Sequence, residues 1–211
     1  MRFLVTAGPT QEPIDPVRYI SNRSSGRMGY AVAEAAIEAG HAVTLVSGRV
    51  NLTPPPLATV IPVTTSDEMH AAVTGQVANH DVLIMCAAVA DYRPATVSKH
   101  KLKKKTERLS LELVPTRDIL GSLPRVRKFL VVGFAAETND VEKYARKKLQ
   151  DKNLDLIVAN DVSRTDIGME SADNEVTILF RDGQTKKISR SSKKNIAREL
   201  VKIISNMKKN V

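Results

Sequence analysis

Short apolar runs alternate along the chain with segments whose apolar residues recur every three or four positions. The apolar runs predict buried strands at residues 3–6, 42–46, 60–64, 82–88, 129–134 and 156–158. The periodic segments predict helices at residues 27–39, 66–78, 141–152 and from 192 onward. Because strands that are apolar throughout are buried on both faces, this alternation predicts a mostly parallel sheet with helices on both faces.

Two segments break the alternation and predict antiparallel structure. Residues 108–115 alternate apolar and polar side chains, as an edge strand does. Residues 176–181 and 185–188 flank Asp182-Gly183, a turn sequence that predicts a hairpin. The expected fold class is therefore α/β and Rossmann-like, with a small antiparallel extension at about 108–115 and 175–188. No repeat or linker interrupts residues 1–211, so we expect a single domain.

The segment between the first strand and the first helix carries the clearest chemical signal. Three prolines stiffen it, and it ends in Ser24, Ser25 and Gly26, where the helical pattern begins. A helix N-terminus presents free backbone N–H groups and the positive end of the helix dipole, which favour a bound phosphate. A simple helix cap is the alternative interpretation. Arg18 and Asn22, which lead into this site, favour phosphate binding.

Polar residues follow three successive strands of the predicted sheet. The strands between residues 82 and 158 lead into loops of small residues that also carry Asp91, Glu137 and Asn160. Small residues let a ligand approach the backbone closely. Because ligands bind beyond the carboxyl ends of strands in such sheets, these loops predict one ligand site.

Lysines supply candidate anion ligands at two places. Residues 99–105 form a basic run without an apolar period, and Lys101 lies within it. Such runs are usually solvated surface, but this one follows a strand-end loop, so a flap at about 95–107 that closes over a polyanion is the functional alternative. Lys148 and Lys152 share one face of their helix and favour anion binding.

The composition is that of an ordinary soluble protein, with 42% hydrophobic and 26% charged residues. The formal net charge of +9 fits nucleic acid, an acidic ligand or solubility alone. Aromatic residues make up only 4% and Trp is absent, which argues against a base-stacking surface. The lysines near the C-terminus, Lys193 among them, are interpreted as a solvated helix face.

No apolar stretch approaches the roughly 18 residues of a membrane span, and the N-terminus lacks a signal-peptide pattern, so we expect no membrane partner and a cytoplasmic location. The one cysteine, Cys86, fits a reducing compartment and is interpreted as a small buried residue rather than a nucleophile. The four histidines are scattered without ligand spacing, so we expect no metal site made of side chains.

Tyr144 and Lys148 have the spacing of the catalytic pair in short-chain dehydrogenases. Those enzymes need a glycine-rich dinucleotide loop after the first strand. Here that loop holds Gly8 and Pro9, and no G-x-G-x-x-G sequence occurs in the chain. An oxidoreductase is therefore the third and weakest hypothesis.

A series of motifs, taken in order, resembles the phosphopantothenate–cysteine ligase family of bacterial coenzyme A synthesis. They are TAGPT (6–10), IDPVR (14–18), SNRSSGRMG (21–29), VTLVSG (43–48), AAVADYR (87–93), KLKK (101–104), GFAAET (133–138) and ANDV (159–162). The resemblance runs from Thr6 to about Phe180. It departs from the family pattern at Arg49, where a proline is usual, and in the loop at about 165–174.

The resemblance implies a ligase that joins 4′-phosphopantothenate to L-cysteine. The substrate carboxylate attacks the α-phosphate of CTP to give an acyl-cytidylate and pyrophosphate, and the amine of cysteine then displaces CMP. The implied nucleotide site comprises Met85, Cys86, Ala87, Asp91, Lys101, Arg117, Asp118, Ile119, Leu120, Phe134, Lys148 and Lys152. Asn22 and Ala88 are expected to contact the pantothenoyl part, and Ser24, Ser25 and Gly26 a phosphate. Asn22 and Lys101 are the expected catalytic residues.

The family resemblance also implies a homodimer with its sites near the subunit interface, and Mg²⁺ bound with the nucleotide. Most bacterial relatives carry this domain behind a flavin-binding decarboxylase, a half absent from this sequence, so we expect ligation only and no flavin. The residues alone leave the choice between CTP and ATP open. A non-enzymatic nucleic-acid binder is the competing hypothesis, and it predicts one broad basic stripe rather than a cluster around one cleft.

Overall fold

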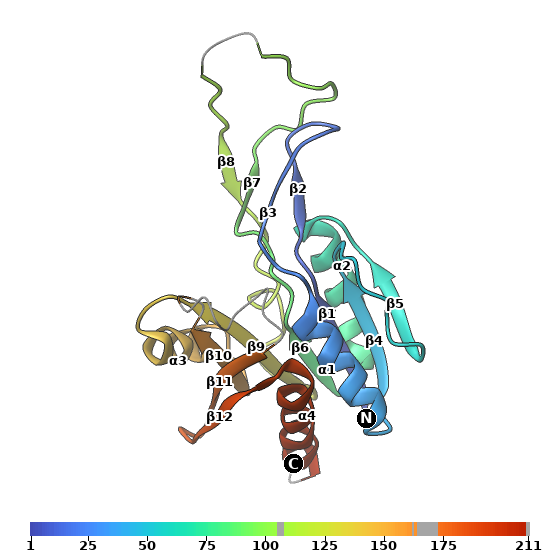
Figure 1. Cartoon of the computed structure of the whole chain (residues 1–211), viewed down its shortest axis with the longest axis vertical. Coiled ribbons are helices and arrows are strands. Elements are labelled where there is room, and N and C mark those ends of the chain that lie inside the picture. The colour runs from blue at the N-terminus through green and yellow to red at the C-terminus, as the bar shows by residue number, and fades with distance from the viewer. Residues whose placement is uncertain (105–107, 162, 164–172, 210–211) are drawn as a thin grey trace.

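The computed structural model of the chain describes residues 1–104, 108–161, 163 and 173–209. Its centre is an eight-stranded sheet with the strand order β12-β11-β10-β9-β6-β1-β4-β5 (Figure 1). Six neighbouring strands are parallel, namely β1 (Arg2–Ala7), β4 (Ala42–Ser47), β5 (Ala58–Pro62), β6 (Val82–Met85), β9 (Leu130–Glu137) and β10 (Leu156–Asp161). At one edge, β11 (Asp173–Phe180) and β12 (Thr185–Ser192) form the predicted antiparallel hairpin. The mostly parallel, Rossmann-like fold is confirmed.

Helices cover both faces of this sheet, as the sequence predicts. On one face, α1 (Arg27–Glu38) and α4 (Lys193–Lys209) bury Phe3 and Val5. On the other, α2 (Ser66–Gln76), the short 3-10 helix η1 (Val77–Asn79) and α3 (Val141–Asp151) bury Leu4. Consecutive strand residues point to opposite faces, so these three neighbours belong to two different cores. This double burial is the reason for the continuous apolar runs.

The strand at 82–88 ends earlier than its apolar pattern predicts. β6 stops at Met85 because the N–H groups of Cys86 and Ala87 both donate to Thr6 Oγ1, at 3.1 Å, instead of continuing the ladder. A strand-end loop therefore begins at Cys86. The small residues that follow are loop rather than strand, and this positions them at the carboxyl edge of the sheet.

Two antiparallel ribbons form an arm that extends away from the sheet (Figure 1). One ribbon pairs β2 (Gln11–Pro13) with β3 (Tyr19–Ser21), in a segment expected to be loop, and the other pairs β7 (Tyr92–Pro94) with β8 (Leu113–Pro115). The predicted strand at 108–115 is therefore wrong in its first half. Leu109 and Leu111 stay 63% and 39% exposed, because their alternating pattern has no buried face within one chain.

The basic segment at 95–104 lies at the far end of this arm and is tied to the first ribbon. The carboxylate of Asp15 is fully covered and accepts hydrogen bonds from Arg18 and from Leu102 N, the latter at 3.0 Å. Arg18 Nη2 also donates to Leu102 O at 3.0 Å. The Arg18 guanidinium holds the pKa of Asp15 well below its usual range. The expected flap is thus anchored at Leu102. Lys105 and the loop at 165–172 lie outside the described residues.

Candidate functional site

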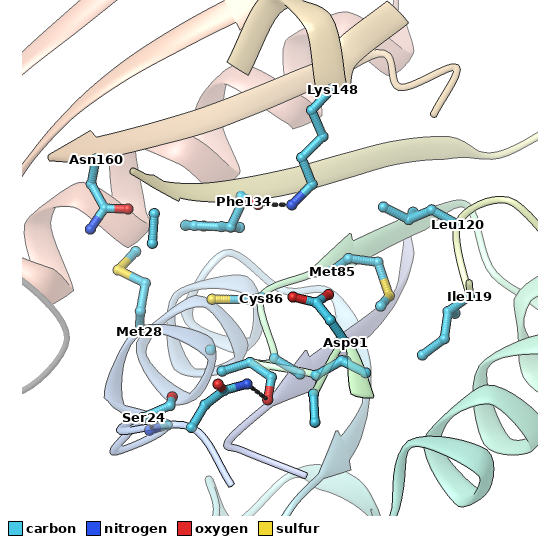
Figure 2. A pocket seen from close by; sticks show the side chains of 18 of the residues that line it. Ser24, Met28, Met85, Cys86, Asp91, Ile119, Leu120, Phe134, Lys148 and Asn160 are labelled. Atoms are coloured by element: carbon cyan, nitrogen blue, oxygen red, sulfur yellow. Dashed lines mark hydrogen bonds between the residues drawn. The ribbon is translucent and has the colours of Figure 1, made fainter. Parts of the chain in front are cut away.

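A cavity of about 540 Å³ opens at the carboxyl ends of β6, β9 and β10, beside the start of α1. Small-molecule sites have volumes of roughly 300–1,000 Å³. In Figure 2, Ile119 and Leu120 lie at one end of this cavity, Met28 and Asn160 lie at the other, and Cys86 lies between them. The cavity brings together all the expected site residues except Lys101: Asn22, Ser24, Ser25, Gly26, Met85, Cys86, Ala87, Ala88, Asp91, Arg117, Asp118, Ile119, Leu120, Phe134, Lys148 and Lys152.

Two glycines of the SNRSSGRMG motif bring α1 against the cavity. Gly26 has a φ of 75°, in the left-handed region that strains any side chain. A Cβ at Gly29 would lie only 2.6 Å from Ala7 Cβ, so glycine allows α1 to pack closely on β1. Gly26 is itself the N-cap, and within the described residues no side chain caps α1. Ser24 and Ser25 line the cavity instead, so the helix-cap interpretation of these hydroxyls is wrong.

The loop that follows β6 is held against the end of β1. Ala88 O accepts hydrogen bonds from Thr10 N at 3.2 Å and from Asn22 Nδ2 at 3.1 Å. Thr10 Oγ1 accepts another from Ala90 N at 3.0 Å. The Asn22 side chain is therefore fixed at the cavity wall by its amide nitrogen. The side-chain carbonyl oxygen of Asn22 is a hydrogen-bond acceptor. Asn22 therefore carries both a donor and an acceptor beside Ala88.

Lys148 reaches the cavity from α3 and donates to Phe134 O at 3.0 Å (Figure 2). Burial lowers its pKa, and the carboxylates of Glu137 and Asp91 oppose that shift. Lys152, which directly follows the last residue of α3, forms an ion pair with Asp118. Burial alone would raise the pKa of Asp118, but the hydrogen bonds from Lys152 and from the backbone hold it below its usual value. The two lysines thus form one cationic end of the cavity, as their spacing predicts.

The environment of Cys86 keeps its thiol protonated. Burial raises the pKa of Cys86 to about 12, and the positive charge of Lys193 opposes this shift only in part. A thiolate is the nucleophilic form of cysteine, so Cys86 contributes no nucleophile at neutral pH. Cys86 is half-buried at the cavity wall, so the interpretation of a fully buried residue is wrong, whereas the protonated thiol agrees with the interpretation that Cys86 is not a nucleophile.

Lys193 and Asn174 also line the cavity, and the sequence did not single them out as site residues. Both are only 5% exposed. The interpretation of Lys193 as part of a solvated helix face is wrong, because the first residue of α4 lies beside the start of α1 and the hairpin β11–β12. With Arg27, Arg117, Lys148 and Lys152, it makes five basic residues around one cavity, the arrangement that favours a ligase over a nucleic-acid binder.

Lys101 does not line the cavity of its own chain. Its neighbour Leu102 is bonded to Asp15 in the arm, whereas the cavity lies in the body of the molecule. Tyr144 is likewise absent from the cavity wall and is 40% exposed, so the dehydrogenase-like spacing of Tyr144 and Lys148 does not place the two side chains in one site.

Within residues 1–104, 108–161, 163 and 173–209, no three His, Cys, Asp or Glu side chains gather as metal ligands. In the same ranges, no helix combines the length and the apolar character needed to cross a bilayer.

Comparisons with known proteins agree with this geometry. Residues 1–207 match the model of the family described as the DNA/pantothenate metabolism flavoprotein C-terminal domain. The coenzyme A biosynthesis bifunctional protein CoaBC of Vibrio vulnificus is 49% identical over 97% of this chain and 52% of its own length. The Bacillus subtilis protein of the same description is 48% identical over 98% of this chain and 51% of its own length. The chain thus spans about half the length of these curated relatives.

Solved structures that are similar to this chain come from the same kind of protein. The crystal structure of the C-terminal domain of a CoaBC protein superposes with a TM-score of 0.85 at 44% identity, covering 100% of this chain and 96% of that chain. A DNA/pantothenate metabolism flavoprotein from Streptococcus pneumoniae superposes with a TM-score of 0.84 at 26% identity, covering 98% of this chain and 99% of that chain. The chain belongs to the family of the DNA/pantothenate metabolism flavoprotein C-terminal domain.

Proposed function

We propose that this chain is a ligase of coenzyme A biosynthesis that joins 4′-phosphopantothenate and L-cysteine through an acyl-cytidylate. The observation that carries the proposal is one cavity that holds both Asn22 and the lysine pair of α3. The family resemblance gives the first to the pantothenoyl part and the second to the nucleotide. The coenzyme A biosynthesis proteins that match this chain add support at the level of the pathway.

The reaction needs positioning and charge neutralisation rather than a side-chain nucleophile. In the first step a carboxylate oxygen of 4′-phosphopantothenate bonds to the α-phosphorus of CTP, and the bond from that phosphorus to the bridging oxygen breaks, releasing pyrophosphate. Lys148 and Lys152 would stabilise the negative charge near the nucleotide. Both substrates are anions, which also accounts for the basic lining of the cavity.

In the second step the amine of cysteine bonds to the acyl carbon, loses a proton, and CMP leaves with the electrons of the carbon–oxygen bond. Asn22 lies beside Ala88 and is suited to hold the acyl or phosphoryl oxygen during this transfer. The protonated thiol of Cys86 is consistent with a mechanism in which no enzyme cysteine attacks.

We propose that Mg²⁺ arrives with the triphosphate and neutralises part of its charge. The described residues hold no cluster of side-chain metal ligands, so this chain would act on the ion through the nucleotide. We propose further that these 211 residues bind no flavin and perform ligation alone.

We propose a homodimer in which the arm of one copy completes the site of the other. Lys101 lies on the arm, away from its own cavity, and the arm exposes apolar side chains including Val17, Tyr19 and Leu109, at 59%, 53% and 63%. Such a surface is typical of an interface. Sedimentation should show a dimer at micromolar concentration, and a purely monomeric protein would contradict the proposal.

The decisive assay combines the protein with 4′-phosphopantothenate, cysteine, Mg²⁺ and either CTP or ATP. Amide product and pyrophosphate should form together, and faster with CTP than with ATP. Equal or faster turnover with ATP would refute the nucleotide assignment and leave the ligase intact. Absence of amide with either nucleotide would refute the ligase.

A further inference from the structure

Thr6, near the carboxyl end of β1, has a hydroxyl group whose hydrogen-bonding capacity is fully used inside the protein. The residue is buried, and Oγ1 accepts hydrogen bonds from Cys86 N and Ala87 N, both at 3.1 Å. The hydroxyl donates its own hydrogen to Met85 Sδ at 3.8 Å. A hydroxyl has one donor and two acceptor positions, so these bonds leave none for a ligand. Any effect of Thr6 on a ligand must therefore pass through the loop that follows β6.

The N–H groups of three consecutive residues of this loop face the chain segment that contains Thr6. Besides the two bonds to Thr6, Ala88 N donates to Gly8 O at 3.0 Å. The peptide units of the loop are trans, and in a trans unit the C=O group points opposite to the N–H group. The carbonyl oxygens of Cys86 and Ala87 therefore point away from the end of β1.

This arrangement gives one part of the cavity wall a definite polarity. Cys86 and Ala87 line the cavity, which opens on the side of β6 where β9 and β10 lie. Because their N–H groups are taken, these two residues offer a ligand only acceptor oxygens. Backbone N–H groups attract a phosphate, whereas carbonyl oxygens repel one. This part of the wall is thus suited to an uncharged group that donates a hydrogen bond.

The nucleotide that we assign to the cavity carries such a group on its base. Cytosine has an exocyclic amino group, which is a donor, where uracil has an acceptor oxygen. A wall of carbonyl oxygens therefore favours cytosine, since uracil would leave acceptors facing each other. The ribose hydroxyls are also donors, but they are the same in both nucleotides. A comparison of the two bases therefore separates these two sources of a donor.

We propose that Thr6 is a positioning residue that sets the choice of base. By holding the N–H groups of Cys86 and Ala87, it directs their carbonyl oxygens to the base and selects an exocyclic amino group over the oxygen of uracil. This proposal rests on the ligase function proposed above, in which this cavity takes the nucleotide. Thr10 offers a matched comparison, because its buried hydroxyl accepts from Ala90 N at 3.0 Å, in the same loop but beyond the two carbonyl groups.

The test measures the binding of CMP and of UMP by calorimetry to the wild type, Thr6→Val, Thr6→Ser and the control Thr10→Val. The wild type should bind CMP about tenfold or more tightly than UMP, the scale of one hydrogen bond and the unpaired acceptor that its loss leaves. Valine keeps the shape of threonine but accepts no hydrogen bond, so in Thr6→Val the preference should narrow to about threefold or less. Thr6→Ser keeps the hydroxyl and should restore it. Thr10→Val should weaken both nucleotides alike and keep the ratio.

The ratio of the two affinities distinguishes positioning from general stability. If Thr6 only stabilised the fold, Thr6→Val would lower both affinities by one factor, and an unchanged ratio would overturn the proposal. Equal binding of CMP and UMP by the wild type would also overturn it and would assign the carbonyl groups to the ribose. Neither readout uses amide formation, so a wild-type protein that distinguishes the bases but forms no amide would refute the ligase function alone.

A measurement on the wild-type protein covers the case in which Thr6→Val fails to fold. Cys86 is the one cysteine of the chain, so protein made with cysteine that carries ¹³C at its carbonyl carbon has a single labelled carbonyl group. The signal of a carbonyl carbon moves when its oxygen accepts a new hydrogen bond. The Cys86 signal should therefore shift when CMP saturates the protein, and much less when UMP does. Equal shifts with the two nucleotides would overturn the proposal.

Discussion

The body of the molecule, which is the eight-stranded sheet with its helices, and the arm differ in the side chains that they present. The body holds a cavity whose walls come from strand ends, with polar groups such as Asn22, Asn174 and Lys148 fixed by the surrounding backbone or by burial. The arm carries exposed apolar side chains and Lys101, and its ribbons are only three residues long. The body therefore holds the candidate binding cavity, whereas the arm is proposed to act by contacting a second copy of the chain.

The strongest challenge to this division is the change Lys101→Gln. If the arm supplies a catalytic charge, this substitution should slow acyl-cytidylate formation by about two orders of magnitude or more, the scale of a lost charge-stabilising donor. Stability should not change, because Lys101 is exposed. Rapid quench with labelled CTP measures the step.

The matched control for Lys101 is Lys103→Gln, in the same exposed basic run. One exposed charge among several is screened at physiological salt, so this variant should stay near the wild-type rate. Similar rates for the two variants would show that the run is only solubilising charge. The division between a binding body and a catalytic arm would then fail.

Asn22→Asp tests the body side of the comparison. The substitution replaces the amide donor that bonds Ala88 O with a carboxylate, and two acceptors then face each other. We expect a folded protein that still makes acyl-cytidylate but transfers it to cysteine about tenfold or more slowly, because a hydrogen bond to the reacting oxygen is lost. Intermediate accumulation and amide formation are measured in one time course. Amide formation at the wild-type rate would show that Asn22 has no role in the transfer and is only part of the loop before α1.

Asp15→Asn tests whether the tether of the arm matters to the site. An amide has a single acceptor oxygen and no charge, so the bonds from Arg18 and Leu102 N cannot all be kept. Hydrogen exchange at the Leu102 amide should become about tenfold faster, while CMP binding in the body stays unchanged. The step that depends on Lys101 should slow with it. Equal exchange in both proteins would show that the tether is not what orders this segment.

The same carboxylate gives the tether a pH dependence. The pKa of Asp15 is lower in the folded chain than in an unfolded one, so its contribution is fully present above the unfolded value, about pH 4, and is lost as the pH falls below that value. After correction for the slower intrinsic exchange of amides in acid, exchange at Leu102 should therefore be less protected at low pH in the wild type. In Asp15→Asn it should follow only the intrinsic chemistry of exchange.

The sequence predicted the body well because its signals are local. Apolar runs fix the strands, and small residues after them fix the cavity edge, so Cys86, Asp91 and Asn160 were found without tertiary information. The prediction that Lys193 lies on a solvated helix face was wrong because its burial depends on α4 packing beside α1, over 150 residues away in the chain. No local sequence pattern indicates such a contact. The strand predicted at 108–115 was wrong in its first half for a similar reason. Leu109 and Leu111 alternate with polar residues as in a strand, yet they have no buried face within one chain.

The smallest expected effect comes from Cys86, the one thiol in the chain. The mechanism gives it no chemical role, so Cys86→Ala should retain ligase activity within about twofold, and its loss of packing should be limited to about 1 kcal/mol for one small half-buried group.

Because burial raises the thiol pKa to about 12, alkylation of the folded wild type should be slow near pH 8.5, where a free cysteine is half ionised, and become fast on unfolding. Below that pH the raised pKa costs nothing; above it the unfolded chain gains a thiolate that the folded chain lacks, so this part of the stability is lost between about pH 8.5 and 12 and Cys86→Ala should not show it. Rapid alkylation of the native protein, or loss of amide formation in Cys86→Ala, would indicate a reactive thiol in the cavity. Either result would contradict a mechanism in which no enzyme cysteine attacks.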